Sequence, residues 1–203
     1  MDSSISIVFP ERSSESFSVV STIYTIGHST RSIEDFLKVL KKYEIAVLAD
    51  VRLIPKSRTN PQFSQEALES SLRNAGIEYR HFMGLGGHRR PVENSPNGGW
   101  HNESFRGYAD YATTREFQQN LQSLIEIAET HTTAIMCAEF VPWKCHRSII
   151  ADYLLVRGLY VIDIFDEKHS RKHVLTNFAK VANRIFLIYP SDTPPLDQSS
   201  WSF

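Results

Sequence analysis

From residue 23 onward, short apolar runs alternate with amphipathic stretches, and this alternation is the strongest constraint on the fold. The runs are rich in β-branched and aromatic residues, as strands are. Between them, apolar residues recur at the spacing of a helix with one buried face. Strands that alternate with helices predict a parallel sheet covered by helices on both faces. We therefore predict a single-domain, three-layer α/β/α fold with a mostly parallel, Rossmann-like sheet.

The same patterns give approximate bounds for the elements. Strands are predicted over residues 23–26, 45–51, 77–82, 133–138 and 159–165. Helices are predicted to begin after Ser32 and Ser64, and two more are predicted over residues 105–130 and 145–156. A glycine-rich loop follows the third strand and has six of the nine glycines of the chain within residues 84–107. A long loop inside a compact domain is usually functional or mobile. Near the C-terminus we expect a helical stretch over residues 168–182 and a strand over residues 184–189.

Length and composition limit the class of protein. The chain has 203 residues, of which 41% are hydrophobic, and a formal net charge of -1. These values suit one domain over residues 22–190, with a flexible Ser-rich arm at 1–21 and a tail at 191–203. The balanced charge argues against a protein that coats nucleic acid through its overall charge. No apolar run is long enough to span a membrane, so we expect no membrane partner. The two cysteines are too few for a disulfide scaffold, and no signal peptide is recognisable, so we expect a cytoplasmic protein.

Polar and reactive residues gather where the predicted strands end. In open parallel sheets, ligands bind beyond the carboxyl ends of the strands, so these residues are expected to meet at one edge. The candidates in chain order are His28, Ser29, Asp50, Arg52, Gly86, Gly87, Arg89, Glu139, Cys145, His146, Arg147 and Ser148. Acids, bases, a thiol and guanidinium groups would thus line one pocket.

Cys145 is the sharpest candidate, because it lies where a helix is expected to begin. Free amide groups and the helix dipole favour an anion there, either a thiolate or a bound phosphate. Lys144 and Arg147 would lower the pKa of the thiol further. We predict that Cys145 is a nucleophile or a redox thiol, and the alternative is a small buried residue that closes a helix–sheet contact.

Cys137 lies inside an apolar strand and, taken alone, is more typical of a core residue. Its separation from Cys145 leaves three interpretations open: a redox disulfide, a metal site that includes Glu139 and His146, or one active thiol beside a packing thiol. The spacing matches no zinc finger, and Cys145 and His146, as neighbours at a helix start, are not expected to face the same way. We therefore predict no metal and no other cofactor, with zinc as the alternative.

Three residues are predicted to act as acid or base beside the thiol, namely His28, Glu139 and Asp50. A histidine in a strand-to-helix turn can exchange protons near neutral pH or bind an anion. The alternative for His28 is stabilisation of the turn. For the two carboxylates the alternative is an ion pair that only supports the structure.

Arginines are clustered locally although the total charge is close to zero. Arg52 and Arg58 lie in one stretch without acidic residues, and Arg89 lies in another, with aromatic residues such as Phe105 nearby in the sequence. Arginine beside aromatic surfaces suits a phosphate joined to a base, so the expected ligand is a phosphate-bearing small molecule or a nucleic acid. The glycines match neither the dinucleotide fingerprint nor the P-loop, and a solvated loop face is the alternative.

Several short motifs follow one another in a characteristic order. They include Thr25-Ile26-Gly27-His28-Ser29, Asp50-Val51-Arg52, Leu85-Gly86-Gly87-x-Arg89, Cys137-Ala138-Glu139 and Cys145-His146-Arg147-Ser148. Together, over about residues 22–165, they resemble the bacterial and archaeal family called domain of unknown function 488. The resemblance implies a compact α/β domain and contains the same candidate residues, but it implies no reaction.

These observations favour an enzyme in which Cys145 acts on a phosphate-bearing ligand. The arginines predicted to hold the anion are Arg52, Arg58, Arg89 and Arg147. One alternative is a non-catalytic module that binds nucleotides or nucleic acid through the same arginines. The other is a metal site built on the two thiols.

Overall fold

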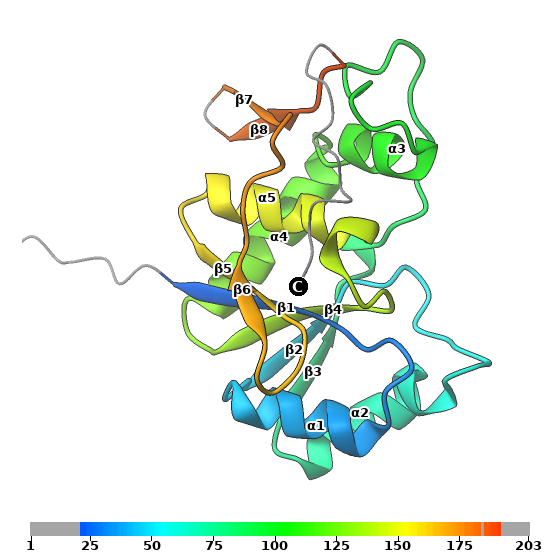
Figure 1. Ribbon diagram of the computed structural model, residues 1–203, viewed down its shortest axis with the longest axis vertical. Helices are drawn as coiled ribbons and strands as arrows, with labels where there is room; N and C mark the ends of the chain where they lie inside the picture. The colour runs from blue at the N-terminus through cyan, green and yellow to red at the C-terminus, as the bar shows by residue number, and fades with distance from the viewer. Residues whose placement is uncertain (1–20, 184, 192–203) are drawn as a thin grey trace, which may run out of the picture.

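The computed structural model describes residues 21–183 and 185–191 of the chain. A six-stranded sheet with the order β3-β2-β4-β1-β5-β6 forms its centre (Figure 1). The first five strands of that order run parallel, and β6 pairs antiparallel with β5. The strands are β1 Thr22–Gly27, β2 Val47–Asp50, β3 Glu78–His81, β4 Thr133–Cys137, β5 Tyr160–Ile164 and β6 Ser170–Lys172. The predicted arm and tail lie outside the described residues, except for their innermost positions.

Five helices in the described part of the chain cover the two faces of this sheet. On one face lie α1 (Ile33–Lys42) and α2 (Gln65–Asn74), and on the other lie α3 (Glu103–Tyr111), α4 (Arg115–Ala128) and α5 (Arg147–Val156). The strands β1, β2, β4 and β5 contribute to two separate cores, because successive side chains point to opposite faces. In β1, for example, Ile26 packs with the α1 and α2 side and Ile23 with the other side. The predicted α/β/α fold is therefore confirmed.

Local sequence signals explain where the first helices begin and end. The Ser32 hydroxyl accepts a hydrogen bond from the Asp35 backbone N–H at 3.1 Å, which caps α1. Gly76 follows α2 with φ +75°, a left-handed conformation that favours glycine after a helix. Thr114 caps α4 in the same way as Ser32 caps α1, so the single helix predicted over residues 105–130 is two helices, α3 and α4.

The helix predicted over residues 168–182 is wrong. Residues 170–172 instead form the edge strand β6, and Lys180–Ala182 forms the strand β7. Strand β7 pairs with β8 (Phe186–Ile188) in a separate hairpin, and β8 lies within the strand predicted over residues 184–189. The reason is a tertiary contact that no periodicity reveals. His173 turns inward after β6 and hydrogen-bonds to Asp152 of α5 and Asp163 of β5, at 3.1 and 3.0 Å.

The order of the strands sets the position of the functional residues. Strand β4 lies between β1 and β2, and the register pairs Gly27 with Cys137 and Asp50 with Met136. The chain therefore leaves β1, β4 and β2 side by side at the carboxyl edge of the sheet. Such an edge, where neighbouring strands lead into helices on opposite faces, is the usual ligand site of open α/β sheets.

Candidate functional site

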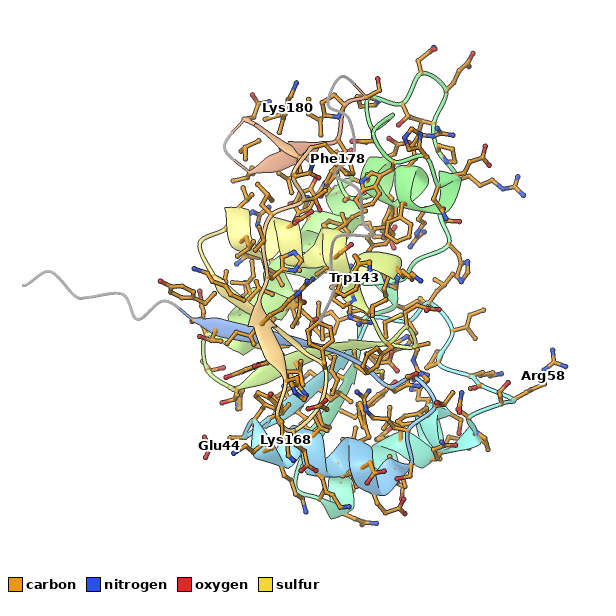
Figure 2. The ribbon with its side chains drawn as sticks, viewed as in Figure 1. Glu44, Arg58, Trp143, Lys168, Phe178 and Lys180 are labelled. Carbon is orange, nitrogen blue, oxygen red and sulfur yellow. The ribbon has the colours of Figure 1, made fainter. Side chains whose placement is uncertain are left out.

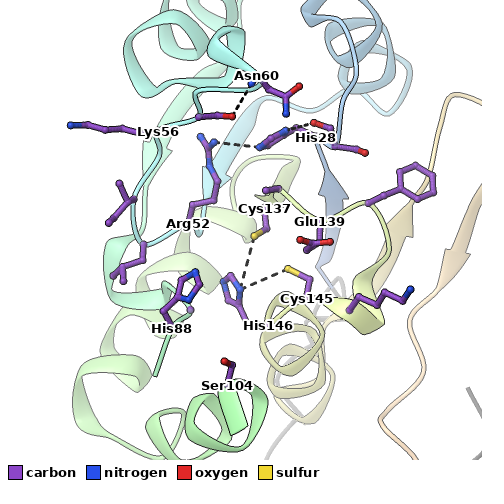
Figure 3. A pocket seen from close by; sticks show the side chains of 18 of the residues that line it. His28, Arg52, Lys56, Asn60, His88, Ser104, Cys137, Glu139, Cys145 and His146 are labelled. Atoms are coloured by element: carbon purple, nitrogen blue, oxygen red, sulfur yellow. Dashed lines mark hydrogen bonds between the residues drawn. The ribbon is translucent and has the colours of Figure 1, made fainter. Parts of the chain in front are cut away.

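A cavity of about 650 Å³ opens at this edge of the sheet. Its walls come from the segments that follow β1, β2 and β4, together with the glycine-rich loop and the start of α3 (Figure 3). Seven of the residues predicted for the site line it: His28, Ser29, Arg52, Gly87, Glu139, Cys145 and His146. Cys137, predicted to be a core residue, is buried and also reaches the wall.

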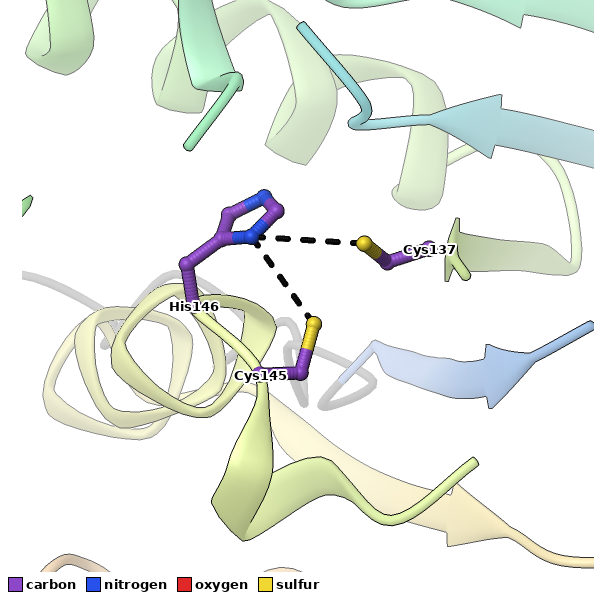
Figure 4. A group of neighbouring side chains, drawn as sticks. All are labelled: Cys137, Cys145 and His146. Atoms are coloured by element: carbon purple, nitrogen blue, oxygen red, sulfur yellow. Dashed lines mark hydrogen bonds between the residues drawn. The ribbon is translucent and has the colours of Figure 1, made fainter. Parts of the chain in front are cut away.

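Cys137, Cys145 and His146 form one cluster (Figure 4), and all three line this cavity. The Nδ1 atom of His146 lies 3.8 Å from the Cys145 sulfur and 4.0 Å from the Cys137 sulfur. The other ring nitrogen, Nε2, donates to the carbonyl of Val51 at 2.9 Å. That bond fixes the proton on Nε2, so the lone pair of Nδ1 faces the two thiols. The cluster is therefore a base beside two thiols, and its three ligand atoms could also hold a soft metal ion.

The expectation that Cys145 and His146 face different ways is wrong. A short 3₁₀ turn, Pro142–Lys144, precedes Cys145, whose backbone is extended with φ -135° and ψ 143°. Helix α5 begins only at Arg147, two residues later than predicted. Because Cys145 lies outside the helix, helical spacing does not separate its side chain from that of His146.

The glycine-rich loop holds the His146 ring in place. A Cβ atom at Gly87 would lie 2.9 Å from His146 Nδ1 and 3.3 Å from its Cγ. Only a residue without a side chain allows the loop to pack this closely against the imidazole. The loop itself is anchored by the Tyr108 hydroxyl of α3, which donates to the Leu85 carbonyl at 2.6 Å.

The two thiols have opposite electrostatic environments. Burial raises the pKa of Cys145, but a hydrogen bond from Cys137, the charge of Arg147 and its backbone N–H outweigh burial and lower that pKa to about 7. The hydrogen bond to Cys145, followed by burial, raises the pKa of Cys137 well above its ordinary value. Cys145 is thus the thiol that ionises, and Cys137 is a neutral donor beside it.

Arg147 does not line the pocket. Its guanidinium is fully buried and donates to the carbonyl oxygens of Glu139 and Phe140, at 2.6 and 2.8 Å. These carbonyls belong to the segment that joins β4 to Cys145. Arg147 takes part in none of the ion pairs found in the described residues. The two hydrogen bonds from Arg147 hold this segment in its shape. A negative charge on the Cys145 sulfur would in turn be a counter-charge for the buried guanidinium.

Asp50 lies behind the pocket and orients Arg52. The carboxylate accepts from Arg52 Nε at 2.9 Å and Nη2 at 2.5 Å, and from the Tyr79 hydroxyl at 2.9 Å. Arg52 Nη1 donates to the Phe63 carbonyl and approaches His28 Nε2 at 3.4 Å. Asp50 is fully buried and paired, so its placement matches the ion pair considered as an alternative to acid–base work.

His28 lies in the pocket wall as a neutral ring. Burial lowers the pKa of His28 to about 4. The hydrogen bond that Nδ1 donates to the Ser29 carbonyl at 2.8 Å raises this pKa, but by less than burial lowers it. The ring stacks on Phe63, with centroids 4.2 Å apart. Glu139, in contrast, is exposed at the pocket and close to Cys145 (Figure 3). Of the predicted acid–base residues, Glu139 is the one with a carboxylate on the cavity.

The remaining predicted ligand residues lie away from the cavity. Arg58 projects into solvent from a loop (Figure 2). Arg89 stacks on the Tyr111 ring, 3.7 Å from its centroid, and Gly86 packs against the Leu53 backbone. The Ser148 hydroxyl donates to the Cys145 carbonyl at 2.9 Å and so supports the turn before α5.

Several pocket residues were not among the predicted site residues. They are Lys56, Asn60, His88, Ser104 and Lys144, together with apolar side chains such as Ile54 and Phe140. Two signals were available, since Lys56 belongs to the basic stretch of Arg52 and Lys144 precedes Cys145. His88 stands at the unspecified position of the motif Leu85-Gly86-Gly87-x-Arg89, and Asn60 and Ser104 lie in none of the motifs quoted above, so these three carry no comparable signal.

Comparisons with known proteins give a family but no close relative. The family model described as "Domain of unknown function DUF488" matches residues 32–154, more than half of the chain, and includes Cys137, Cys145 and His146. No curated protein and no solved structure matches the chain. In the described part of the chain, none of the helices has the length and apolar character needed to cross a membrane.

Proposed function

The chain belongs to the family described as domain of unknown function DUF488, and from the geometry of its pocket we propose that it is a thiol-dependent enzyme. In this proposal Cys145 is the nucleophile, His146 is its base, and the substrate carries a phosphate group joined to a flat ring, as a nucleotide does. The two thiols are free, which suits a reducing compartment, and we place the protein in the cytoplasm.

One observation carries the proposal: the Cys145 sulfur lies 3.8 Å from a histidine nitrogen whose lone pair faces it, at the wall of a cavity. A nucleophile beside a base that a third group orients is the common arrangement of thiol enzymes. Here the orienting group is the Val51 carbonyl, which accepts from His146 Nε2. Distances in a ligand-free site are commonly longer than in the reacting complex.

The proposed reaction proceeds in two steps. His146 Nδ1 takes the Cys145 proton, and the thiolate forms a bond to an electrophilic atom of the substrate while the bond to the leaving group breaks. The proton on His146 passes to that leaving group. Water then attacks the adduct, with Glu139 accepting its proton. The hydroxide bonds to the transferred group, the bond from sulfur to that group breaks, and the proton returns from Glu139 to the Cys145 sulfur.

Charge and ring surfaces around the cavity support an anionic substrate with an aromatic part. Lys56 and Lys144 are exposed at the cavity, whereas Glu139 is the acidic side chain that lines it. Arg52 adds a guanidinium that Asp50 already holds in position. Phe105 and Phe140 supply apolar surface on which a base can stack.

Alkylation of the metal-free protein tests the nucleophile. With chelator present at pH 7, we expect iodoacetamide to modify Cys145 more slowly in His146→Ala than in the natural protein, by up to about tenfold, because the thiol loses the imidazole that accepts its proton. The hydrogen bond from Cys137 and the charge of Arg147 remain in this variant and limit the effect. His131→Ala removes an exposed histidine on the opposite edge of the sheet and is the matched control. Equal rates in the natural protein and in His146→Ala would refute the assignment of the base.

Protection from alkylation tests the substrate class. Adenosine 5′-monophosphate is expected to slow the modification of Cys145, and inorganic phosphate to do so more weakly. The double variant Lys56→Ala/Lys144→Ala should lose most of this protection, whereas Lys42→Ala, an exposed lysine at the end of α1, should keep it. If neither probe protects Cys145, the substrate does not carry a phosphate. If the probes protect Cys145 but its alkylation rate is the same in the natural protein and in His146→Ala, the protein is a non-catalytic binding module.

A further inference from the structure

The three ligand atoms of the Cys137, Cys145 and His146 cluster have the spacing of a tetrahedral metal site. Zinc binds thiolate sulfur at about 2.3 Å and imidazole nitrogen at about 2.0–2.1 Å, which places sulfur and nitrogen about 3.6 Å apart around one ion. In the cluster these separations are 3.8 and 4.0 Å, and all three atoms lie within 4.8 Å of one another. Two sulfur atoms at about 2.3 Å from one tetrahedral ion lie about 3.8 Å apart. Movements of up to about one ångström would therefore bring all three atoms to the distances of a bound ion.

The surroundings of the cluster also match those of a metal ligand set. A histidine that binds a metal usually donates its other N–H to a carbonyl or carboxylate, which fixes the ring. His146 does this, since Nε2 donates to the Val51 carbonyl at 2.9 Å while Nδ1 faces the sulfur atoms. We infer that Cys137, Cys145 and His146 bind one soft divalent cation of the Zn²⁺ type, with the fourth coordination position open to the cavity.

The donor set determines which ions fit. Two sulfur atoms and one imidazole nitrogen select zinc and related ions over Mg²⁺ and Ca²⁺, which prefer oxygen. Within the described chain, no fourth histidine, cysteine or carboxylate joins the group. The fourth ligand is therefore water or a substrate atom that enters from the cavity. Each thiol that still carries a proton releases it to solvent on binding, and the two thiolate charges balance the charge of the ion.

Metal binding has a consequence for the proposed enzyme, and this consequence alone rests on the proposed function. Binding to the ion withdraws electron density from the Cys145 sulfur and makes it a weaker nucleophile. The single lone pair of His146 Nδ1 is then bound to the ion, so this nitrogen no longer accepts a proton. The ion and the free thiolate are alternative occupants of one site. Zinc would thus switch off the thiol chemistry, and chelation would restore it.

Titration of the metal-free, full-length protein with Co²⁺ tests the site directly. We expect one equivalent to produce thiolate-to-cobalt charge-transfer absorption in the near ultraviolet and the visible bands of tetrahedral cobalt, and Zn²⁺ to displace both. Cys137→Ser and His146→Ala should each weaken Co²⁺ binding by about tenfold or more, by analogy with the loss of supporting groups around other metal ligands. His131→Ala should bind as the natural protein does.

A second measurement uses only the natural protein, so it does not depend on the folding of variants. One equivalent of Zn²⁺ should protect Cys145 from alkylation, and Mg²⁺ should not. The inference is overturned if Co²⁺ gives no charge-transfer band, or if the band persists unchanged in both Cys137→Ser and His146→Ala.

The cobalt titration and the alkylation of the metal-free protein together separate this inference from the proposed function. A cobalt spectrum together with metal-free alkylation that is unaffected by His146→Ala would support the metal site and contradict the thiol enzyme. Alkylation that depends on His146 without any cobalt spectrum would do the reverse.

Discussion

Arg147 supports the segment that connects the two cysteines. It is a fully buried cation that donates to the carbonyls of Glu139 and Phe140, in the segment between Cys137 and Cys145. Each of these charge-assisted hydrogen bonds contributes about 1.5–3 kcal/mol, and loss of the guanidinium takes the donor from both carbonyls.

We therefore expect Arg147→Met to lower the free energy of unfolding by about 3 kcal/mol. Urea unfolding measures this change. Arg58→Met, which removes the same charge from a solvent-exposed side chain, should change the free energy by no more than about 0.5 kcal/mol. Similar stabilities of the two variants would show that Arg147 does not hold this segment.

At the residue scale, the sequence predicts which residue types lie near the site but not where each side chain points. The general rule that parallel strands end at one edge of the sheet is enough to predict that Cys145, His28 and Glu139 lie at the site. Asp50 and Arg147 follow the same rule, yet both point away from the cavity. Asp50 binds Arg52, and Arg147 binds backbone carbonyls. These partners lie within eight residues in the sequence, but the path of the turns between them decides which side chain meets which group, and the residue pattern does not contain that path.

The glycine-rich loop is the element that holds the imidazole against the thiols. In Gly87→Ala the new Cβ atom would lie 2.9 Å from His146 Nδ1, so either the ring or the loop must move. We expect slower metal-free alkylation of Cys145 and weaker Co²⁺ binding, each by about tenfold, because the base and ligand atom is displaced. Rate measurements and the cobalt titration test this.

Gly98→Ala is the control for that loop. Its Cβ atom would meet the side chain of Ser191 at 3.4 Å, which is an ordinary contact. The alkylation rate and the Co²⁺ affinity of this variant should match those of the natural protein. If Gly87→Ala also matches, the close approach of the loop to His146 has no role in the site.

Elements with a strong period and a cap could be predicted, and elements fixed by tertiary pairing could not. The helix after Ser32 has apolar residues on one face and a capping hydroxyl, so its bounds follow from local chemistry. Strand β6 is three residues long and polar, and pairing with β5 alone makes it a strand. Cys145 and His146 illustrate the same limit, since the extended backbone at Cys145 comes from the preceding turn and not from the helix pattern.

At the scale of the whole molecule, the layers could be predicted but the order of the strands could not. Alternation of strands and helices is enough to predict a parallel sheet between two helical layers. It does not say that β4 lies between β1 and β2, which brings Cys137 between His28 and Arg52. That order depends on which strand faces pack best, a property of the complete core.

A buried network of charged and polar side chains joins strands β1 and β5 to helix α5 and to the residues that follow strand β8. His173 lies between Asp152 and Asp163 at 3.1 and 3.0 Å. Asp163 also accepts from Thr25 of β1, and Asp152 accepts from the Tyr189 hydroxyl. One imidazole thus connects strands, a helix and the hairpin region, and its protonation affects the stability of the whole fold.

The direction of this effect follows from the pKa of His173. Burial lowers that pKa, but the hydrogen bonds and charges of the two carboxylates outweigh burial and raise it from 6.5 to about 9. Folding therefore favours the protonated ring. The network stabilises the protein fully below about pH 6.5, and its contribution is lost as the pH rises through about 9, a change of about 3 kcal/mol at 1.36 kcal/mol per pKa unit.

Comparison with His173→Gln isolates this contribution from every other titrating group. Urea unfolding from pH 6 to pH 10 should show the natural protein losing its advantage over His173→Gln, by about 3 kcal/mol across that range. His131→Gln, which changes an exposed histidine, should follow the natural protein at every pH. A difference between the natural protein and His173→Gln that stays constant with pH would mean that His173 contributes hydrogen bonds without its charge, and that the fold is not coupled to the protonation of this ring.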